Sequence, residues 1–292
     1  MQVAKKLILE QLSPIYPKQE IDSISRLIFE KVPGLSRIQV LLNPNETISA
    51  ANLAQIKEIV YRLSQFEPIQ YILGETEFYG SRFKVNPSVL IPRPETEELV
   101  DWVVNDYKHS APVLLDIGTG SGCIPISIVR NLPGASAEGW DISPDALDIA
   151  NGNARNNRVK VKLRCVDILK PVILDENVKY DVIVSNPPYV TTSEQTLMQR
   201  NVINFEPHIA LFVPDDDPLI FYRKISDLAI NHLKPGGHLY LEINEKYGAQ
   251  TAELFASAGF IKIEVKKDIN GRQRMIKCEK PQQNQIVNLP FL

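Results

Sequence analysis

The feature that most constrains the fold is a glycine-rich segment between an apolar strand and a helix. An apolar run, Val113-Leu114-Leu115, leads into Asp116-Ile117-Gly118-Thr119-Gly120-Ser121-Gly122. A helical pattern begins at Ile124, with Pro125 in the first turn, where its missing N–H costs little. Glycines at this point let the backbone approach a ligand closely at the positive end of a helix. We call residues 116–122 the glycine turn and expect a ligand site there.

Strand and helix patterns alternate from Ala111 onward, as in α/β proteins with a parallel sheet. Further strands are predicted at residues 137–140, 159–164, 181–185 and 238–243. Two more, at residues 260–266 and 274–278, flank Asn270-Gly271, a strong hairpin signal. The expected fold is therefore α/β, a Rossmann-like, doubly wound sheet with a terminal antiparallel hairpin.

The length of 292 residues favours two domains. From Met1 to about Phe66, apolar residues recur at helical spacing, which indicates a small all-α bundle in which Ser49 could cap a helix. Two short strands, at residues 77–80 and 83–85, are expected around a Gly80-Ser81 turn. The expected divisions are a helical domain at 1–70, a β-hairpin linker at 71–98, an α/β domain at 99–280 and a tail at 281–292.

The charge and cysteine content argue against several classes of protein. The formal net charge is −3, so no overall basic field points to nucleic acid or to an anionic membrane. The three cysteines and four histidines lack the spacing of metal ligands, so we expect no metal and a reducing compartment. The sequence has no signal-peptide pattern and no run of eighteen apolar residues, which favours a cytoplasmic protein that does not enter a membrane.

The spacing of the glycine turn favours S-adenosylmethionine over NAD. Its glycines follow the pattern GxGxG, whereas dinucleotide folds use GxGxxG, and no P-loop lysine follows. Asp141 lies nineteen residues past Gly122, at the end of the next strand, where a carboxylate can accept both hydroxyls of a ribose. Asp167, after the following strand, could accept from the adenine amine. The alternatives are a plain tight turn, a solvated Asp141 and an ordinary loop aspartate.

A second motif, Asn186-Pro187-Pro188-Tyr189, follows the apolar strand at residues 180–185. An open α/β sheet places its chemistry at the carboxyl ends of its strands. The two prolines fix the backbone and remove two N–H donors, and Asn186 is held extended by the proline after it. The result is a rigid turn rich in hydrogen-bond acceptors, which suits a planar –NH2 group. A turn in which Tyr189 merely packs is the alternative.

This motif suits methyl transfer to a poorly nucleophilic nitrogen. The lone pair of an amide or aromatic –NH2 is delocalised, and accepting hydrogen bonds from both N–H groups returns electron density to the nitrogen. Asn186 Oδ1 and the Pro187 carbonyl could do so and aim the lone pair at a sulfonium methyl for in-line transfer. Tyr189 could stack on the planar group. The scheme needs no general base before transfer, because the proton can leave afterward to water.

From about Pro68 to Cys278, the chain resembles the peptide chain release factor N(5)-glutamine methyltransferases, the HemK-type (PrmC/HemK) family. Adenine-amine methyltransferases share the Asn-Pro-Pro-Tyr motif, but its combination with the Ile-Pro-Arg-Pro-Glu-Thr-Glu segment is specific. The stretches that carry the resemblance are Tyr71-Ile72-Leu73-Gly74, Glu77-Phe78-Tyr79-Gly80, Leu90-Ile91-Pro92-Arg93-Pro94-Glu95-Thr96-Glu97 and Asn186-Pro187-Pro188-Tyr189.

The resemblance implies a class I S-adenosylmethionine-dependent methyltransferase domain behind a helical domain that docks the release factor. Its substrate would be the glutamine of the Gly-Gly-Gln motif, and no direct binding of nucleic acid is expected. By position, Asn186, Pro187, Pro188 and Tyr189 would hold the glutamine. The cofactor would contact Gly118, Thr119, Gly120, Ser121, Gly122, Asp141, Asp167, Ile168 and Asn186. Arg93, Glu95 and Thr96 would close over the cofactor or, alternatively, only form a salt-bridged helix start.

The sequence departs from the family pattern at two places. Ile168 stands where some members have an aromatic residue against the adenine. Residues 212–217 replace a glycine-rich loop, and their acids either meet a basic release-factor surface or form an exposed acidic turn. Two other functions stay open: a nucleic-acid amine methyltransferase, which would flip a base and have a basic, salt-sensitive face, and a non-catalytic protein-binding module.

Overall fold

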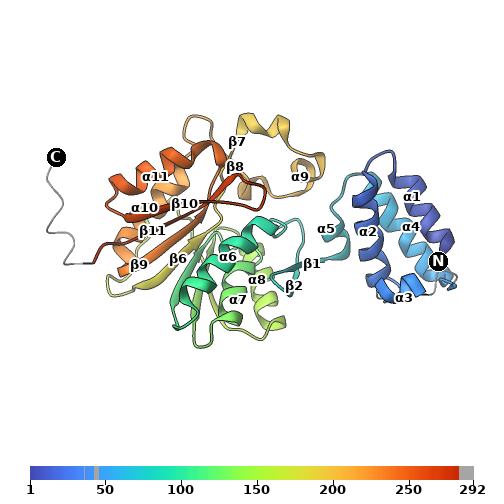
Figure 1. Ribbon diagram of the computed structural model, residues 1–292, viewed down its shortest axis with the longest axis horizontal. Helices are drawn as coiled ribbons and strands as arrows, with labels where there is room; N and C mark the ends of the chain where they lie inside the picture. The colour runs from blue at the N-terminus through green and yellow to red at the C-terminus, as the bar shows by residue number, and fades with distance from the viewer. Residues whose placement is uncertain (36, 43–45, 283–292) are drawn as a thin grey trace. The chain divides into compact units, whose positions relative to one another are not determined.

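The computed structural model describes residues 1–35, 37–42 and 46–282, so most of the expected tail lies outside the described residues. The chain divides into two compact units. The first comprises Met1–Gly74 with Gln199–Phe205, and the second comprises Glu75–Met198 with Glu206–Leu292. Figure 1 shows the helices and strands of both units.

The first unit is a helical bundle. Its apolar core includes the pairs Ile8 and Leu12, and Ile24 and Ile28, each at the i, i+4 spacing of a helix. The Ser49 hydroxyl accepts from the Asn52 amide at 3.1 Å and caps its helix, as the sequence predicts. The helices are α1 (Gln2–Leu12), α2 (Lys18–Lys31), α3 (Arg37–Leu42), α4 (Ala50–Ser64), α5 (Ile69–Leu73) and α9 (Arg200–Phe205).

Helix α9 belongs to this unit although it comes more than a hundred residues later in the sequence. The Arg200 guanidinium lies 5.4 Å from the centre of the Phe66 ring, a cation–π contact within the unit. This helix was not predicted from the sequence, because residues 200–205 carry no motif.

The second unit is built on a seven-stranded sheet with the order β10-β11-β9-β6-β3-β4-β5. Figure 1 labels β10, β11, β9 and β6 of this sheet. Five strands are parallel, and the hairpin of β10 and β11 closes the sheet antiparallel against β9. The predicted doubly wound sheet with a terminal hairpin is therefore confirmed. The strands are β3 (Val113–Ile117), β4 (Ser136–Asp141), β5 (Val161–Cys165), β6 (Tyr180–Ser185), β9 (Leu233–Glu242), β10 (Ile261–Lys267) and β11 (Gln273–Glu279).

Helices cover both faces of this sheet. On one face, α6 (Pro94–Tyr107), α7 (Cys123–Asn131) and α8 (Pro144–Asn156) share a core with Val182 and Val184 of β6. On the other, α10 (Ile220–His232) and α11 (Gly248–Ser257) share a core with Ile183. The strand order reverses at β3, whose neighbours are β4 on one side and β6 on the other. A ligand site is expected outside the carboxyl ends of these strands.

A β-hairpin opens the second unit, and its turn differs from the expected one. Strand β1 (Glu75–Phe78) pairs with β2 (Ser81–Lys84), so the two loop residues are Tyr79 and Gly80 rather than Gly80 and Ser81. Both have positive φ, 47° and 67°, as a two-residue type I′ hairpin requires. Helix α6 offsets the strain at Tyr79, because Glu97 accepts from the Tyr79 amide at 2.9 Å.

The same hairpin is anchored to the glycine turn through the buried side chain of Asn153 on α8. Asn153 Oδ1 accepts from the Lys84 amide at 2.7 Å. Its Nδ2 donates to the carbonyls of Lys84, at 3.0 Å, and Ser121, at 2.9 Å. One amide therefore satisfies backbone groups of two segments that are 37 residues apart in the sequence.

The segment between β6 and α10 carries short elements that the sequence analysis did not predict. A parallel pair, β7 (Val190–Thr191) and β8 (Phe212–Val213), encloses 3₁₀ turns at Thr192–Leu197 and His208–Ala210. Another 3₁₀ turn, at Glu245–Tyr247, follows β9. Across the described residues, no helix combines the length and apolar character needed to cross a membrane.

Candidate active site

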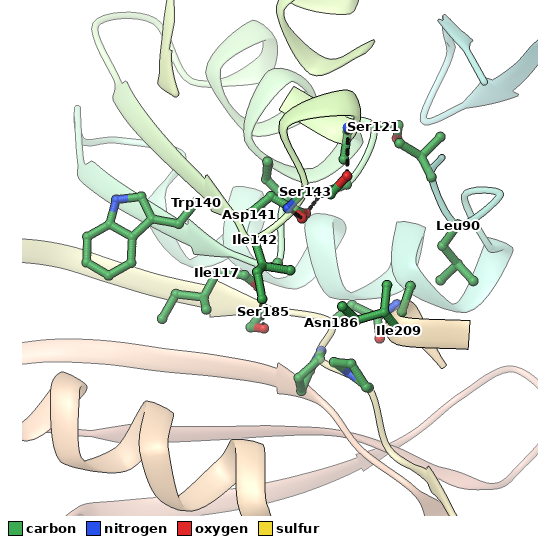
Figure 2. A pocket seen from close by; sticks show the side chains of 18 of the residues that line it. Leu90, Ile117, Ser121, Trp140, Asp141, Ile142, Ser143, Ser185, Asn186 and Ile209 are labelled. Carbon is green, nitrogen blue, oxygen red and sulfur yellow. Dashed lines mark hydrogen bonds between the residues drawn. The ribbon is translucent and has the colours of Figure 1, made fainter. Parts of the chain in front are cut away.

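A cavity of about 210 Å³ lies at the carboxyl ends of β3, β4 and β6. Figure 2 shows Ile117, Asp141 and Asn186, each at or beyond the end of one of these strands, together with Leu90 and Ile209. The Ser185 hydroxyl donates to the Ile117 carbonyl at 2.6 Å and joins the ends of β6 and β3. Both motifs identified in the sequence therefore contribute to one cavity within the second unit.

The conformation of the glycine turn explains its three glycines. Gly118, Gly120 and Gly122 have φ values of 73°, 53° and 77°, a region that L side chains rarely adopt. At Gly122, a Cβ atom would also lie 3.0 Å from the Ile126 Cδ1 atom, so substitution there adds crowding. The amides of Gly118 and Thr119 both donate to the Trp140 carbonyl at 2.8 Å, which fixes the turn against the end of β4.

Asp141 supports the glycine turn as well as lining the cavity. Its Oδ2 accepts from the Gly120 amide at 2.8 Å and its Oδ1 from the Ser143 amide at 2.9 Å. Burial raises the pKa of this carboxyl, and the amides of Ser143, Gly120 and Ile142 oppose the shift. Each carboxylate oxygen has more than one lone pair, so both retain capacity for a further donor. That Asp141 also holds the backbone of the turn was not predicted from the sequence.

Asp116 is a residue of the glycine turn whose importance the sequence analysis missed. It is 0% exposed, and neither carboxylate oxygen has a hydrogen-bond partner among the described residues. The hydroxyls of Thr119 and Ser121, which line the cavity, are likewise buried without a described partner. Burial raises the pKa of Asp116 to about 7; the nearby Thr119 hydroxyl opposes the shift and the charge of Asp141 adds to it.

The pKa of Asp116 predicts a pH-dependent effect of the Asp116→Asn substitution on stability. Because the folded-state pKa of about 7 lies above the ordinary value of 3.8, the folded protein holds a proton that the unfolded chain releases, and this contribution to stability is lost as pH rises from about 4 to 7. An asparagine at this position does not titrate, so it contributes no such change of stability with pH. We expect the unfolding free energy of Asp116→Asn, relative to the native sequence, to increase by about 2–3 kcal/mol between pH 5 and pH 8.

Denaturant unfolding without cofactor, followed by tryptophan fluorescence, measures this difference. Both tryptophans of the chain, Trp102 and Trp140, belong to the second unit. Asp148→Asn, on the exposed side of α8, is the matched control and should change stability equally at both pH values. A relative stability of Asp116→Asn that stays constant between pH 5 and pH 8 would show that Asp116 does not titrate in this range.

Asn186 is connected to a buried glutamate by a chain of hydrogen bonds. Its Nδ2 donates to Thr96 Oγ1 at 3.1 Å, and the Thr96 hydroxyl donates to Glu242 Oε2 at 2.7 Å. The Tyr189 hydroxyl donates to the other carboxylate oxygen, Oε1, at 2.8 Å. Burial raises the pKa of Glu242, while Thr96, Tyr189 and the positive charge of Arg274 oppose the shift. Glu242, the last residue of β9, belongs to no sequence motif and was therefore not predicted as a site residue.

The structure brings most of the predicted site residues to the cavity. The lining includes Arg93, Thr96, residues 118–121, Asp141, Asp167, Ile168 and residues 186–188. Tyr189 is not among the lining residues in the described part of the chain, because its hydroxyl turns to Glu242 and its ring lies 5.9 Å from the Arg274 guanidinium. Glu95 and Gly122 are also not among the described lining residues.

Arg93 makes a short ion pair with the buried Glu206, at 2.5 Å, and the same carboxylate accepts from the Ile91 amide at 3.1 Å. The segment before α6 is therefore fixed to the residue that follows α9 in the sequence.

The acidic residues 215–217 make local contacts: Asp215 accepts from the Ser193 amide at 2.9 Å, and Asp217 pairs with Arg223. Within the described residues, no group of His, Cys, Asp and Glu side chains is placed to hold a metal ion.

Several apolar lining residues were not predicted. Trp140 and Ile142 flank Asp141, so closer attention to the end of the predicted strand could have found them. Val89, Ile209 and Phe221 come from segments without a recognisable motif, and only the fold places them at the cavity.

Comparison with known proteins identifies the family. A family model described as the PrmC N-terminal domain matches residues 8–74, and one described as the methyltransferase small domain matches residues 96–205. A release factor glutamine methyltransferase of Bacteroides thetaiotaomicron is 44% identical over 273 residues, which cover 94% of this chain and 98% of that protein. This chain belongs to the release factor glutamine methyltransferase family. The resemblance identified in the sequence is thereby confirmed.

Another member of the release factor glutamine methyltransferase family, from Streptococcus pneumoniae, is 37% identical over 260 residues, or 88% of this chain and 91% of that protein. Among solved structures, a methyltransferase from Pyrococcus furiosus aligns with a TM-score of 0.52 and 18% identity over 80% of this chain and 100% of that chain. At this identity the similarity concerns the fold alone, which is that of a methyltransferase.

Proposed function

We propose that this protein transfers a methyl group from S-adenosylmethionine to the side-chain amide nitrogen of the glutamine in the Gly-Gly-Gln motif of peptide chain release factors. The observation that carries the proposal is that Asn186 and Pro187 line the same cavity as the glycine turn and Asp141. A planar –NH2 group at Asn186 would thus lie beside the part of the cavity suited to a cofactor. The names of the relatives supply the class of substrate.

The residues around the cavity fit S-adenosylmethionine. Thr119 and Ser121 line the cavity and carry buried hydroxyls without a partner among the described residues, which suits the charged amino-acid end of this molecule. Asp141 retains acceptor capacity for the ribose hydroxyls. Asp167 would accept from the adenine amine, while Ile168, Ile142 and Val166 provide an apolar surface for the ring. When bound, the cofactor supplies an electrophilic methyl group on a sulfonium.

The chain's own residues would then orient the glutamine amide. Asn186 Oδ1 and the Pro187 carbonyl accept from its two N–H groups, which draws electron density to the nitrogen and fixes the direction of its lone pair. The rigid backbone of Pro187 and Pro188 holds these acceptors in place before the substrate binds. No side chain needs to remove a proton before transfer, and the proton leaves to water afterward.

The remaining predicted residues take supporting roles in this proposal. Tyr189 would support the site through its hydroxyl, which holds Glu242. Arg93, Glu95 and Thr96 would border the cofactor from the start of α6, with Arg93 held by Glu206. The helical domain at residues 1–70 would dock the release factor, in agreement with the family match at residues 8–74. Relatives that act on release factors also favour the cytoplasm as the site of action.

The proposal is tested by incubating the purified protein with S-adenosylmethionine and a purified release factor, followed by mass spectrometry of the Gly-Gly-Gln peptide. We expect one added methyl group on the glutamine, and none on a release factor in which that glutamine is replaced by glutamate. Parallel reactions contain ribosomal RNA or duplex DNA. Methylation of a nucleic acid with no modification of the protein would overturn the proposal in favour of a base-amine methyltransferase.

A further inference from the structure

In the chain of hydrogen bonds from Asn186 through Thr96 to Glu242, the buried Glu242 determines which group donates and which accepts. Glu242 is 1% exposed, and its two oxygens face the hydroxyls of Thr96 and Tyr189 at 2.7 and 2.8 Å. We propose that Glu242, acting through Thr96, fixes which end of the Asn186 side-chain amide faces the substrate. Glu242 and Thr96 are thus positioning residues for methyl transfer. The inference rests on the proposed function and extends it to residues that carry no motif.

The direction follows from the donor and acceptor capacity of each group. An ionised carboxylate can only accept, so the single hydroxyl proton of Thr96 is committed to Glu242 Oε2. Toward Asn186, 3.1 Å away, the Thr96 oxygen can then only accept. An amide offers a donor at one end and an acceptor at the other. The end of Asn186 that faces Thr96 must therefore be Nδ2, and Oδ1 lies at the other end.

Asn186 Oδ1 receives no hydrogen bond from any described residue, while the Asn186 side chain lines the cavity. Oδ1 is thus the atom available to an incoming –NH2 group. The opposite orientation would place Nδ2 against a substrate donor, and a buried donor without an acceptor is unfavourable. Fixing the amide before the substrate arrives is a form of electrostatic preorganisation.

Two further contacts keep Glu242 in the accepting state. The Tyr189 hydroxyl donates to Oε1, so both carboxylate oxygens already have a donor. Burial raises the pKa of Glu242, and Arg274, whose guanidinium lies 5.9 Å from the centre of the Tyr189 ring, supplies a positive charge that opposes this shift and favours the ionised form. Because Tyr189 lies outside the described cavity lining, its link to Glu242 gives it a role in the site that does not require stacking on the substrate.

The kinetic test is a double-mutant cycle between Thr96 and Asn186, measured as kcat with saturating cofactor and release factor. Thr96→Val has nearly the shape of threonine but no hydroxyl, and we expect it to lower kcat by at least about tenfold. Thr96→Ser retains the hydroxyl and should stay within about threefold of the native rate. In an Asn186→Ala background, Thr96→Val should cause no further decrease, because the group that Thr96 orients is already absent.

Glu242→Gln provides the same cycle should Thr96→Val fold poorly, since it keeps the volume of Glu242 but replaces one acceptor with a donor. An equal decrease of kcat in the native and Asn186→Ala backgrounds, for the variant that folds, would overturn the proposal. So would a Thr96→Val enzyme of native rate. Both results would mean that Thr96 and Glu242 do not act through Asn186.

A second measurement needs no substrate. In side-chain amide NMR spectra, the Asn186 Nδ2 signals are assigned by their loss in Asn186→Ala. They should shift and exchange faster with solvent in Thr96→Val, but not in Thr96→Ser. Unchanged signals in Thr96→Val would refute the hydrogen-bond chain even if release factors are methylated. Changed signals would support it even if the substrate proved to be another –NH2 compound, so the two proposals are tested separately.

Discussion

The Asn186→Ala enzyme is expected to show a kcat about 10²–10³-fold below that of the native enzyme, with little change in its affinity for S-adenosylmethionine. The substitution removes Oδ1, the acceptor directed at the reacting nitrogen, and leaves the glycine turn and Asp141 intact. A loss of this size is typical when one preorganised hydrogen-bonding group is removed from a site where charge develops in the transition state. Single-turnover methyl transfer with saturating release factor measures it directly.

Asn151→Ala is the matched control for this prediction. Asn151 is exposed on α8, away from the described cavity lining, and its replacement should leave both rate and affinity unchanged. Calorimetric titration with S-adenosylmethionine separates loss of chemistry from loss of binding. If Asn186→Ala turned over at the native rate, Asn186 could not be an acceptor for the substrate amide, and the proposed mechanism would be wrong.

Asp141→Ala should act on the other half of the site and weaken S-adenosylmethionine binding by at least about 10²-fold. Hydrogen bonds to a charged group contribute about 1.5–3 kcal/mol each, and the proposed ribose contact comprises two of them. The substitution also leaves the amides of Gly120 and Ser143 without their acceptor, so the turn itself should lose its order. Both effects raise the dissociation constant.

Isothermal titration calorimetry of Asp141→Ala checks this expectation, with Asp148→Ala on the exposed side of α8 as the control. Asp141→Asn is an intermediate variant. Its side-chain oxygen can still accept from the amide of Gly120 or of Ser143, but its –NH2 group cannot accept from the other. Its affinity should lie between those of the native protein and Asp141→Ala. A native dissociation constant for Asp141→Ala would exclude Asp141 from the cofactor site.

The sequence was sufficient for the sheet because hydrophobic periodicity and turn signals are local. The apolar run at Val113-Leu114-Leu115 and the Asn270-Gly271 signal both correspond to elements of the observed sheet. The β1–β2 turn was placed one residue late, since sequence rules give Tyr79 a low preference for positive φ. Only the fold brings Glu97 to the Tyr79 amide and makes that conformation acceptable.

The candidate site was predictable only where residues belong to a contiguous motif. The glycine turn, Asp141 and Asn186 were identified because strand ends and spacing mark them. Glu242 was not identifiable, because a single glutamate at the end of a strand has no signal, and its meaning depends on Thr96, 146 residues earlier. Thr96 itself was assigned to the cofactor, whereas its hydrogen bonds connect it to Asn186 and Glu242.

The hydrogen bonds of Asn153 couple the stability of the β-hairpin to that of the glycine turn. The same side chain satisfies the backbone of Lys84 in β2 and the Ser121 carbonyl, so neither segment can rearrange without weakening the other. Linkage between two such sites is reciprocal. A ligand that orders the glycine turn would therefore also tighten the hairpin, and damage to the hairpin would appear as a loss of affinity at a site that the hairpin never touches.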